Sequence, residues 1–255
     1  MRITFLGTGT STGVPVIGCG CTTCRSSDPR DRRWRPSIYI ELPDEFSVLV
    51  DASPDLRAQA LAFQLSRVDA ILFTHAHADH VLGLDDVRPF NFKMRRAIPC
   101  YGEKQTIAAI QQMFSYIFDP STPRGGGIPE LIMHTLSGAF FLGAAEFVPV
   151  PVYHGENLIL GYRVGSFAYL TDCSGIPESS WSLLRGVKVL VLDALRERPH
   201  PTHLSLSEAL EVTEKIGPTR AYYTHICHDL SHAKTCARLP DHVTLAYDGL
   251  VIDVE

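Results

Sequence analysis

The chain has 255 residues, of which 45% are hydrophobic and 20% are charged, and this composition excludes collagen, coiled-coil and disordered proteins. The 23 Lys and Arg residues are outnumbered by 28 Asp and Glu residues, which gives a net charge of −5. That balance argues against long nucleic acid or an anionic membrane surface as a partner.

The first ten residues, MRITFLGTGT, lack the basic start, apolar run and cleavage site of a signal peptide. No apolar stretch reaches the length of about 18 residues that a membrane span needs. We therefore expect a cytoplasmic, reducing setting, where cysteines more often bind metal or catalyse than form disulfides. The 11 histidines and seven cysteines are the unusual counts of this composition.

Short apolar runs alternate with helical patterns along the chain. They predict strands at Arg2–Leu6, Ser37–Glu41, Ser47–Asp51, Ala70–Phe73, Glu146–Val152, Leu158–Val164, Phe167–Leu170, Val187–Leu192, Arg220–Tyr223 and Leu250–Val254. They predict helices at Pro54–Gln64, Lys104–Phe118, Glu178–Arg185 and Ser207–Ile216. The last helix has a clear start signal, because Ser205 and Ser207 precede Glu208.

Strands that follow one another directly dominate the first half of the chain and the stretch from Glu146 to Leu170. Such neighbours imply antiparallel or mixed sheets with helices packed outside them. No fixed-period repeat or low-complexity linker divides the chain, so we expect one domain over residues 1–255. Pro120–Pro129, which contains three consecutive glycines, is the most loop-like stretch.

Three histidines and an aspartate follow the apolar run Ala70–Phe73 within six positions, in the segment Thr74-His75-Ala76-His77-Ala78-Asp79-His80. Neutral imidazoles and a carboxylate suit a divalent metal such as zinc, manganese or iron. The alternative is a polar turn with capping groups, but the density of these side chains argues against it. The segment therefore predicts a metal site.

This His-x-His-x-Asp-His pattern after a hydrophobic strand resembles the signature of the metallo-β-lactamase superfamily. The resemblance implies an α/β (α+β) fold: an αββα sandwich of two mixed sheets flanked by helices, with a two-metal site at one edge. It also requires a later histidine, an aspartate at a strand end and a histidine near the C-terminus. His154, Asp172 and His225 each follow an apolar strand and meet these requirements.

The resemblance assigns the two ligand sets residue by residue. One metal takes His75, His77 and His154, the other takes Asp79, His80 and His225, and Asp172 bridges them. Aspartate at 172, where many β-lactamases have cysteine, favours phosphoester chemistry over lactam opening. Asp51, at another strand end, is expected to hydrogen-bond a ligand.

A second cluster, Cys19, Cys21 and Cys24, suits a structural zinc ion, with a redox pair or free thiols as alternatives. Cys-x-Cys-x-x-Cys after a Gly-Thr-Gly loop is similar to the cyclic phosphodiesterases of phosphonate degradation, the PhnP-type metallo-hydrolases. Their fourth zinc ligand is a histidine three residues after the late metal ligand, which implies His228 here. Cys227 is the lower-ranked alternative.

The same resemblance implies a catalytic acid at His203, just ahead of the last helix. Thr202 departs from the asparagine of the family pattern, and His200 is the competing candidate. A dimetal-bridging hydroxide would attack phosphorus, Asp79 would orient the hydroxide, and a protonated His203 would assist the leaving oxygen. Arg57 and Arg163 are candidates for holding a substrate phosphate, with solvated surface arginines as the alternative.

The resemblance implies a metal-dependent phosphoric diester hydrolase with two Mn²⁺ or Zn²⁺ ions and one structural Zn²⁺. Its substrate would be a small cyclic phosphodiester like 5-phosphoribosyl 1,2-cyclic phosphate, which places the chain in phosphonate metabolism. A tRNA 3′-processing endonuclease, a non-catalytic relative such as the coenzyme-PQQ accessory protein, and a thiolesterase or lactamase are the alternatives. The absence of a basic arm disfavours RNA as partner, and related enzymes suggest a homodimer.

Overall fold

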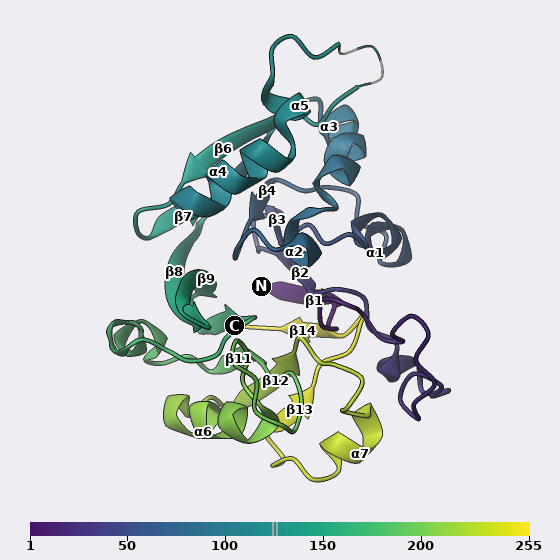
Figure 1. Ribbon diagram of the computed structural model, residues 1–255. Helices are drawn as coiled ribbons and strands as arrows, with labels where there is room; N and C mark the ends of the chain where they lie inside the picture. The colour runs from purple at the N-terminus through teal and green to yellow at the C-terminus, as the bar shows by residue number, and fades with distance from the viewer. Residues whose placement is uncertain (124, 126) are drawn as a thin grey trace.

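The computed structural model describes residues 1–123, 125 and 127–255, and its centre is a pair of seven-stranded sheets (Figure 1). The first sheet has the strand order β14 (Val251–Asp253), β1 (Arg2–Gly7), β2 (Ser37–Glu41), β3 (Ser47–Val50), β4 (Ala70–Leu72), β5 (Ile98–Gly102), β6 (Leu131–Thr135). The second has the order β13 (Val243–Leu245), β12 (Arg220–Thr224), β11 (Val189–Asp193), β10 (Phe167–Leu170), β9 (Asn157–Val164), β8 (Ala145–His154), β7 (Phe140–Leu142).

Both sheets are mixed. In the first, the pairs from β14 to β3 are antiparallel and the pairs from β3 to β6 are parallel. In the second, the pairs from β7 to β10 are antiparallel and those from β10 to β13 are parallel. Because parallel strands end at the same edge of a sheet, the segments that follow them come together there.

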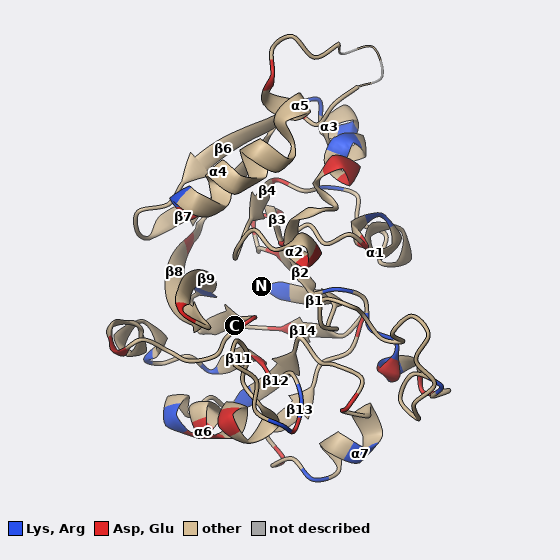
Figure 2. Ribbon diagram, viewed as in Figure 1, with Lys and Arg blue, Asp and Glu red and all other residues tan. Residues whose placement is uncertain are grey.

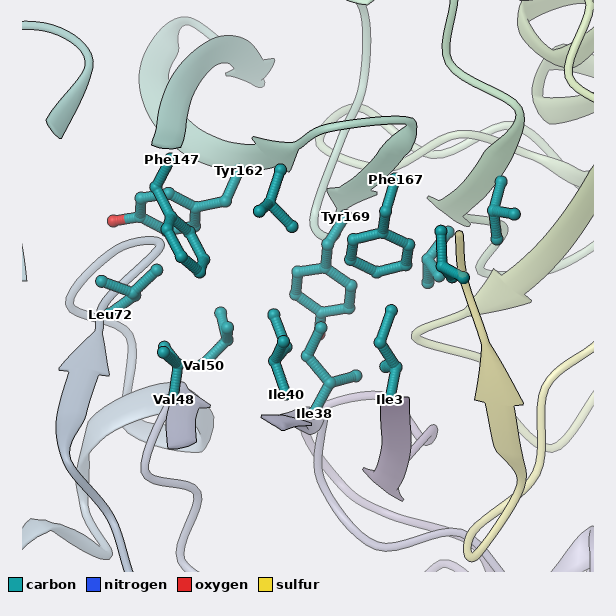
Figure 3. Packing of buried hydrophobic residues seen from close by; sticks show 14 of the residues in the cluster. Ile3, Ile38, Ile40, Val48, Val50, Leu72, Phe147, Tyr162, Phe167 and Tyr169 are labelled. Carbon is teal, nitrogen blue, oxygen red and sulfur yellow. The ribbon is translucent and has the colours of Figure 1, made fainter. Parts of the chain in front are cut away.

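Strict alternation along the central strands builds two faces on each sheet. On β2, Ile38 and Ile40 point into the space between the sheets, whereas Tyr39 points outward. On β10, Phe167 and Tyr169 point inward from the opposite sheet. Figure 3 shows these aromatic rings packed against the isoleucine and valine side chains of the first sheet. Since both faces are buried, these strands carry continuous apolar runs rather than alternating ones.

Helices cover the two outer faces. Over the first sheet lie α1 (Leu56–Ala62), α2 (Ala78–Val81), α3 (Arg88–Met94), α4 (Lys104–Met113), α5 (Ser115–Phe118) and the 3₁₀ turn η2 (Leu84–Val87). Over the second lie α6 (Leu206–Ile216), α7 (His232–Cys236) and the 3₁₀ helix η3 (Glu178–Leu184). A further 3₁₀ turn, η1 (Pro29–Asp31), lies in the loop between β1 and β2. The predicted αββα sandwich of two mixed sheets is confirmed.

Several elements differ from their sequence predictions. The helix expected over Lys104–Phe118 is interrupted at Phe114, whose ψ of 39° leaves the helical range, so α4 and α5 are separate. The segment expected as a helix over Glu178–Arg185 is a 3₁₀ helix. The predicted helix Pro54–Gln64 is shortened at both ends. The described part of the predicted loop Pro120–Pro129 carries neither helix nor strand, and residues 124 and 126 of it lie outside the described residues.

The sequence patterns missed β5, β6, β7 and β13, and also α2, α3 and α7. The strands β6, β7 and β13 are edge strands of their sheets, and β7 and β13 span only three residues each. Their apolar pattern is therefore short or half exposed. In β5, Pro99 and Gly102 interrupt the apolar run that would indicate a strand. Among the residues that the structure describes, no helix combines the length and apolar character of a membrane span.

The inter-sheet core can be tested with two phenylalanines of one hairpin. Phe147 on β8 is fully buried between the sheets, whereas Phe141 on β7 is 69% exposed. Phe147→Ala should lower the free energy of unfolding by about 3–5 kcal/mol, because it removes buried apolar contacts and leaves a cavity. Phe141→Ala should change it by about 0.5 kcal/mol or less. Urea denaturation measures both, and equal losses would contradict this description of the core.

Candidate active site

The ends of four strands gather the predicted ligand residues at one edge of the sandwich. The segment after β4 carries His75 and His77 and runs into α2, which carries Asp79 and His80. The other three residues come from the second sheet: β8 ends at His154, Asp172 follows β10 closely and His225 follows β12. The structure therefore brings together all seven residues that the sequence singled out.

These side chains form two groups in which the candidate ligand atoms lie within 4.8 Å of one another. One group is His75, His77 and His154, and the other is Asp79, His80, Asp172 and His225. Asp172 reaches both: Oδ1 is 3.2 Å from Nε2 of His80 and Oδ2 is 3.9 Å from Nε2 of His75. Asp172 therefore belongs to the second group and also lies close to the first, which is the position of a bridging ligand.

The donor atoms fit divalent cations. Ligand atoms about 2.0–2.2 Å from one tetrahedral ion are about 3.3 Å apart, which is close to the separations of 3.2 and 3.5 Å that His225 Nε2 makes with Asp172 and Asp79. Nε2 of His80 and Nε2 of His225 are buried and find no hydrogen-bond partner among the described residues. Buried polar atoms without a partner are costly, and a metal ion would satisfy both.

Hydrogen bonds on the far side of the rings fix which nitrogen is free to bind. Nδ1 of His80 donates to Asp51 at 2.7 Å, and Asp51 also accepts from the backbone N–H of Thr74 at 2.9 Å. Nδ1 of His154 lies 2.9 Å from the backbone oxygens of Asp172 and Thr202. In both rings Nε2 remains available as a metal ligand, and Asp51 makes the contact expected of it.

Three of the residues that converge here adopt a left-handed backbone conformation. Asp51, Asp172 and His225 have φ values of 63°, 55° and 57°, and each follows the end of a strand. This conformation costs a non-glycine residue about 1–2 kcal/mol. Strain of this kind persists where the surrounding structure enforces it, and it concentrates at functional sites.

Charge inside the site is balanced by opposite partners. Burial by itself raises the pKa of Asp172, but the charges of His225 and His80 outweigh burial and hold that pKa well below its ordinary value. Likewise burial acts to raise the pKa of Asp79, but the neighbouring imidazoles of His225 and His80, with Nε2 atoms 3.5 and 3.4 Å from its Oδ2, outweigh burial and hold that pKa below its ordinary value. Both carboxylates are therefore ionised and able to bind cations at neutral pH.

His203 lies against this site, as its sequence position predicted. Its ring stacks on that of His225, with centroids 4.6 Å apart, and its Nδ1 donates to Asp193 Oδ2 at 2.9 Å. Burial, and then the charge of His225, lower the pKa of His203 to about 3. The ring is therefore neutral before substrate binds, with Nε2 free. The ring of His200 lies beside that of His203, with centroids 5.2 Å apart, but His200 belongs to none of the groups of candidate ligand atoms.

Asp193 is the residue that sequence reasoning missed. It is fully buried at the end of β11, accepts from His203 and lies 3.8 Å from Nδ1 of His225. It therefore orients the candidate acid His203 and places a carboxylate close to the ring of the candidate ligand His225. The available signal was its position, because Asp193 ends an apolar strand in the same way as Asp172.

The cysteine cluster also assembles. Nδ1 of His228 lies 3.2, 3.5 and 3.6 Å from the sulfur atoms of Cys19, Cys21 and Cys24, whereas Cys227 is outside the group. A hydrogen bond from the backbone N–H of Cys24 lowers the pKa of the Cys21 thiol to about 6, while burial raises that of Cys24 to about 11. Four such donors suit one tetrahedral zinc ion, whose binding would displace the remaining protons.

This cluster ties the loop between β1 and β2 to the segment that carries His225. Backbone hydrogen bonds join Thr8 and Thr10 to Ile226. The buried side chain of Arg33 donates to the backbone oxygens of Cys227 at 2.9 Å and Leu230 at 2.7 Å. The loop therefore supports the backbone that directly follows the candidate ligand His225.

Comparison with known proteins agrees with this architecture. The profile of the beta-lactamase superfamily domain matches residues 47–226. A crystal structure of a new diphosphatase from the PhnP family is 46% identical, superposes with a TM-score of 0.93, and covers 100% of this chain and 98% of that one. The chain belongs to the metallo-β-lactamase superfamily and, within it, to the PhnP family.

Two curated relatives also match most of this chain. The octanoyltransferase of Porphyromonas gingivalis (strain ATCC BAA-308 / W83) is 35% identical over 252 residues; the match covers 98% of this chain and 51% of that protein, so the chain spans about half its length. Coenzyme PQQ synthesis protein B of Rhodopseudomonas palustris (strain TIE-1) is 33% identical over 225 residues, 76% of this chain and 73% of that protein.

Neighbouring substitutions test the cysteine cluster. His228→Ala should lower the zinc content by about one ion per chain and lower the unfolding temperature, because it removes one of four ligands. Cys227→Ser, one position earlier, should keep the zinc, and elemental analysis with thermal unfolding measures both. Loss of zinc in Cys227→Ser alone would instead make Cys227 the fourth ligand.

Proposed function

We propose that this PhnP-family protein is a metal-dependent phosphoric diester hydrolase that acts on a small cyclic phosphodiester such as 5-phosphoribosyl 1,2-cyclic phosphate. The observation that carries the proposal is the position of Asp172, within 4 Å of ligands from both groups. A single carboxylate shared by two complete ligand sets suits two cations, and paired cations suit in-line displacement at phosphorus. Mn²⁺ and Zn²⁺ both fit the donor set.

Two divalent cations, when bound, supply positive charge for the phosphoryl oxygens and a nucleophile at neutral pH. The chain's own residues do the rest. Asp79, with Oδ2 3.4 Å from Nε2 of His80 and 3.5 Å from Nε2 of His225, is placed to orient the attacking oxygen through its ionised carboxylate. Thr202 and Asp51 hold the imidazole rings in their binding orientation through backbone and side-chain hydrogen bonds.

His203 is placed to supply the proton that the leaving oxygen needs. Asp193 holds its Nδ1–H, so Nε2 is the atom that gains and releases the proton. The neutral ring gains a proton more easily once an anionic substrate lies beside it, because the negative charge stabilises the imidazolium. We therefore assign His203 the role of general acid in the substrate complex.

Charge favours a small substrate over RNA in this proposal. The net charge is −5, and acidic and basic segments are interleaved over the ribbon (Figure 2). Proteins that hold RNA use clustered basic surfaces to bind its phosphates. We also place the protein in a reducing compartment, because the thiols of the cysteine cluster must stay reduced to bind zinc.

Hydrolysis of a diphosphate bond is the second candidate. It is favoured by the structure at 46% identity, which is described as a diphosphatase. Both reactions displace an oxygen from phosphorus and would use the same two ligand groups. They differ in the leaving group, which for a diphosphate is a phosphate and needs less help from a proton donor.

The reaction class can be tested directly. The protein with Mn²⁺ should hydrolyse bis(p-nitrophenyl) phosphate and leave the lactam nitrocefin intact, and Asp172→Asn should abolish hydrolysis together with metal binding. Cyclic ribose phosphates, diphosphate diesters and tRNA precursors then rank the candidate substrates by kcat/KM. Turnover of nitrocefin with no turnover of any phosphoester would refute the proposal.

His200, three residues before His203, provides a control for the role of His203. His203→Ala should lower kcat on a cyclic phosphodiester by about 10²- to 10⁴-fold, the range for loss of a general acid, without loss of metal. His200→Ala should stay within about threefold of the wild type, since His200 is not the residue held by Asp193. Unchanged turnover in His203→Ala would remove it from the mechanism.

A further inference from the structure

A pocket of about 640 Å³ lies between the loop that carries the cysteines and the two ends of α1. None of the residues that line it belongs to the ligand groups of the candidate metal site. Arg57 and Arg163, the candidates for holding a substrate phosphate, line two other pockets. We call it the Trp34 pocket, after the largest side chain in its wall, and its volume fits a small organic ligand.

Two aromatic rings stand in the wall of the Trp34 pocket. Trp34 and Phe63 are half-buried and meet edge to face, with ring centroids 5.9 Å apart and an interplanar angle of 75°. In this arrangement only one ring of the pair presents its face to the other, so aromatic surface remains for a third ring. A planar ring is therefore the group that matches this part of the wall, because nucleic-acid bases stack on such side chains.

Aliphatic side chains continue the wall around these rings. Val14, Pro15 and Ile17 come from the loop, and Ile17 is fully exposed. Pro29 and Ala62 extend the same apolar surface toward η1 and α1. Apolar side chains that gather in this way at the protein surface are typical of a binding site.

Arg32 lies on the same side of the chain as Trp34. Arg33, between them, forms an isolated antiparallel bridge with Val14, and its side chain is fully buried, where it pairs with Asp31. Alternate side chains of an extended segment point to opposite sides, so Arg32 and Trp34 both point away from the interior. Residues two apart in such a segment are separated by about 6.5 Å. This separation is comparable with the span from the base to the phosphate of a mononucleotide.

The guanidinium of Arg32 is free to bind a ligand. Neighbouring Arg30, Arg33 and Arg35 each pair with an aspartate. Arg32 is exposed and makes no ion pair with any residue that the structure describes. A phosphate would therefore find an unoccupied set of donors there.

The two carboxylates of the wall already have donors of their own. Asp55 accepts from the backbone N–H of Arg35 at 2.9 Å and lies 3.0 Å from its Nε. Asp248 accepts from the backbone N–H of Trp34 at 2.6 Å. The unpaired charge of the wall is thus the positive charge of Arg32, so the pocket favours an anion although the whole chain has a net charge of −5.

We propose that the Trp34 pocket binds a mononucleotide, with the base stacked on Trp34 and the phosphate paired with Arg32. Thr12 adds an exposed hydroxyl to the wall, which can hydrogen-bond to the ribose. This site goes beyond the proposed function, since it shares no residue with the ligand groups. A ligand here would bridge the cysteine loop and α1 and should therefore raise the unfolding temperature.

A fluorescence titration reports on this pocket alone. The chain has two tryptophans, so Trp181→Phe leaves Trp34 as the single indole, and a nucleotide bound at the metal site would not stack on it. AMP should produce a saturable change in this fluorescence. Adenosine, which lacks the phosphate, and ribose 5-phosphate, which lacks the base and is measured in competition with AMP, should each bind at least about tenfold more weakly.

Two arginines of the same loop provide a matched pair of variants. Arg32→Ala should weaken AMP binding about tenfold and leave adenosine binding unchanged, because only the phosphate loses a partner. Arg30→Ala removes an equal charge, but Arg30 pairs with Asp28 and does not line the pocket, so both affinities should stay unchanged.

Equal affinity for AMP and adenosine, equal affinity for AMP and ribose 5-phosphate, or AMP binding that Arg32→Ala does not weaken would each overturn this proposal. Absence of any AMP-dependent change would overturn it too. A dimer in sedimentation that Ile17→Asp dissociates would in that case assign the pocket to a second copy of the chain. These measurements are independent of hydrolysis, so turnover of bis(p-nitrophenyl) phosphate tests the proposed function separately.

Discussion

A buried carboxylate, Asp172, is the constraint on which the site depends. It is 2% exposed and lies among the imidazoles of His75, His80 and His225, which come from both sheets. A buried charge costs several kcal/mol unless opposite charges or hydrogen bonds compensate it. The two sheets must therefore meet with their strand ends in register, because only that arrangement supplies the partners that Asp172 needs.

The same requirement explains the strained backbone around it. Asp51, Asp172 and His225 turn through left-handed conformations within two residues of the ends of their strands. Each turn aims a polar side chain back toward the sheet edge rather than out into solvent. Asp51 then holds the ring of His80 from behind, so that Nε2, which faces Asp172 and Asp79, is left without another partner, and Asp193 holds the ring of His203. Burial, strain and hydrogen bonding all serve one purpose, which is to present free donor atoms in fixed positions.

The cysteine cluster extends this support to the least regular part of the chain. Residues 8–36 connect β1 to β2 with a single 3₁₀ turn among the described elements, and a loop of that length needs tethering. His228 and Arg33 tie it to the segment that begins with His225.

The sequence by itself identified the candidate ligand residues and the central strands. Three histidines and an aspartate within six positions form a pattern too dense for chance. Strands that are buried on both faces have continuous apolar sequences, as in Phe167–Leu170. Edge strands such as β6 left no such pattern, because one face is exposed. Only the tertiary structure decided that Asp193 orients His203 and that His228 rather than Cys227 faces the three thiols. Those facts depend on which distant segments meet at an edge, and that is set by sheet pairing between residues far apart in the chain.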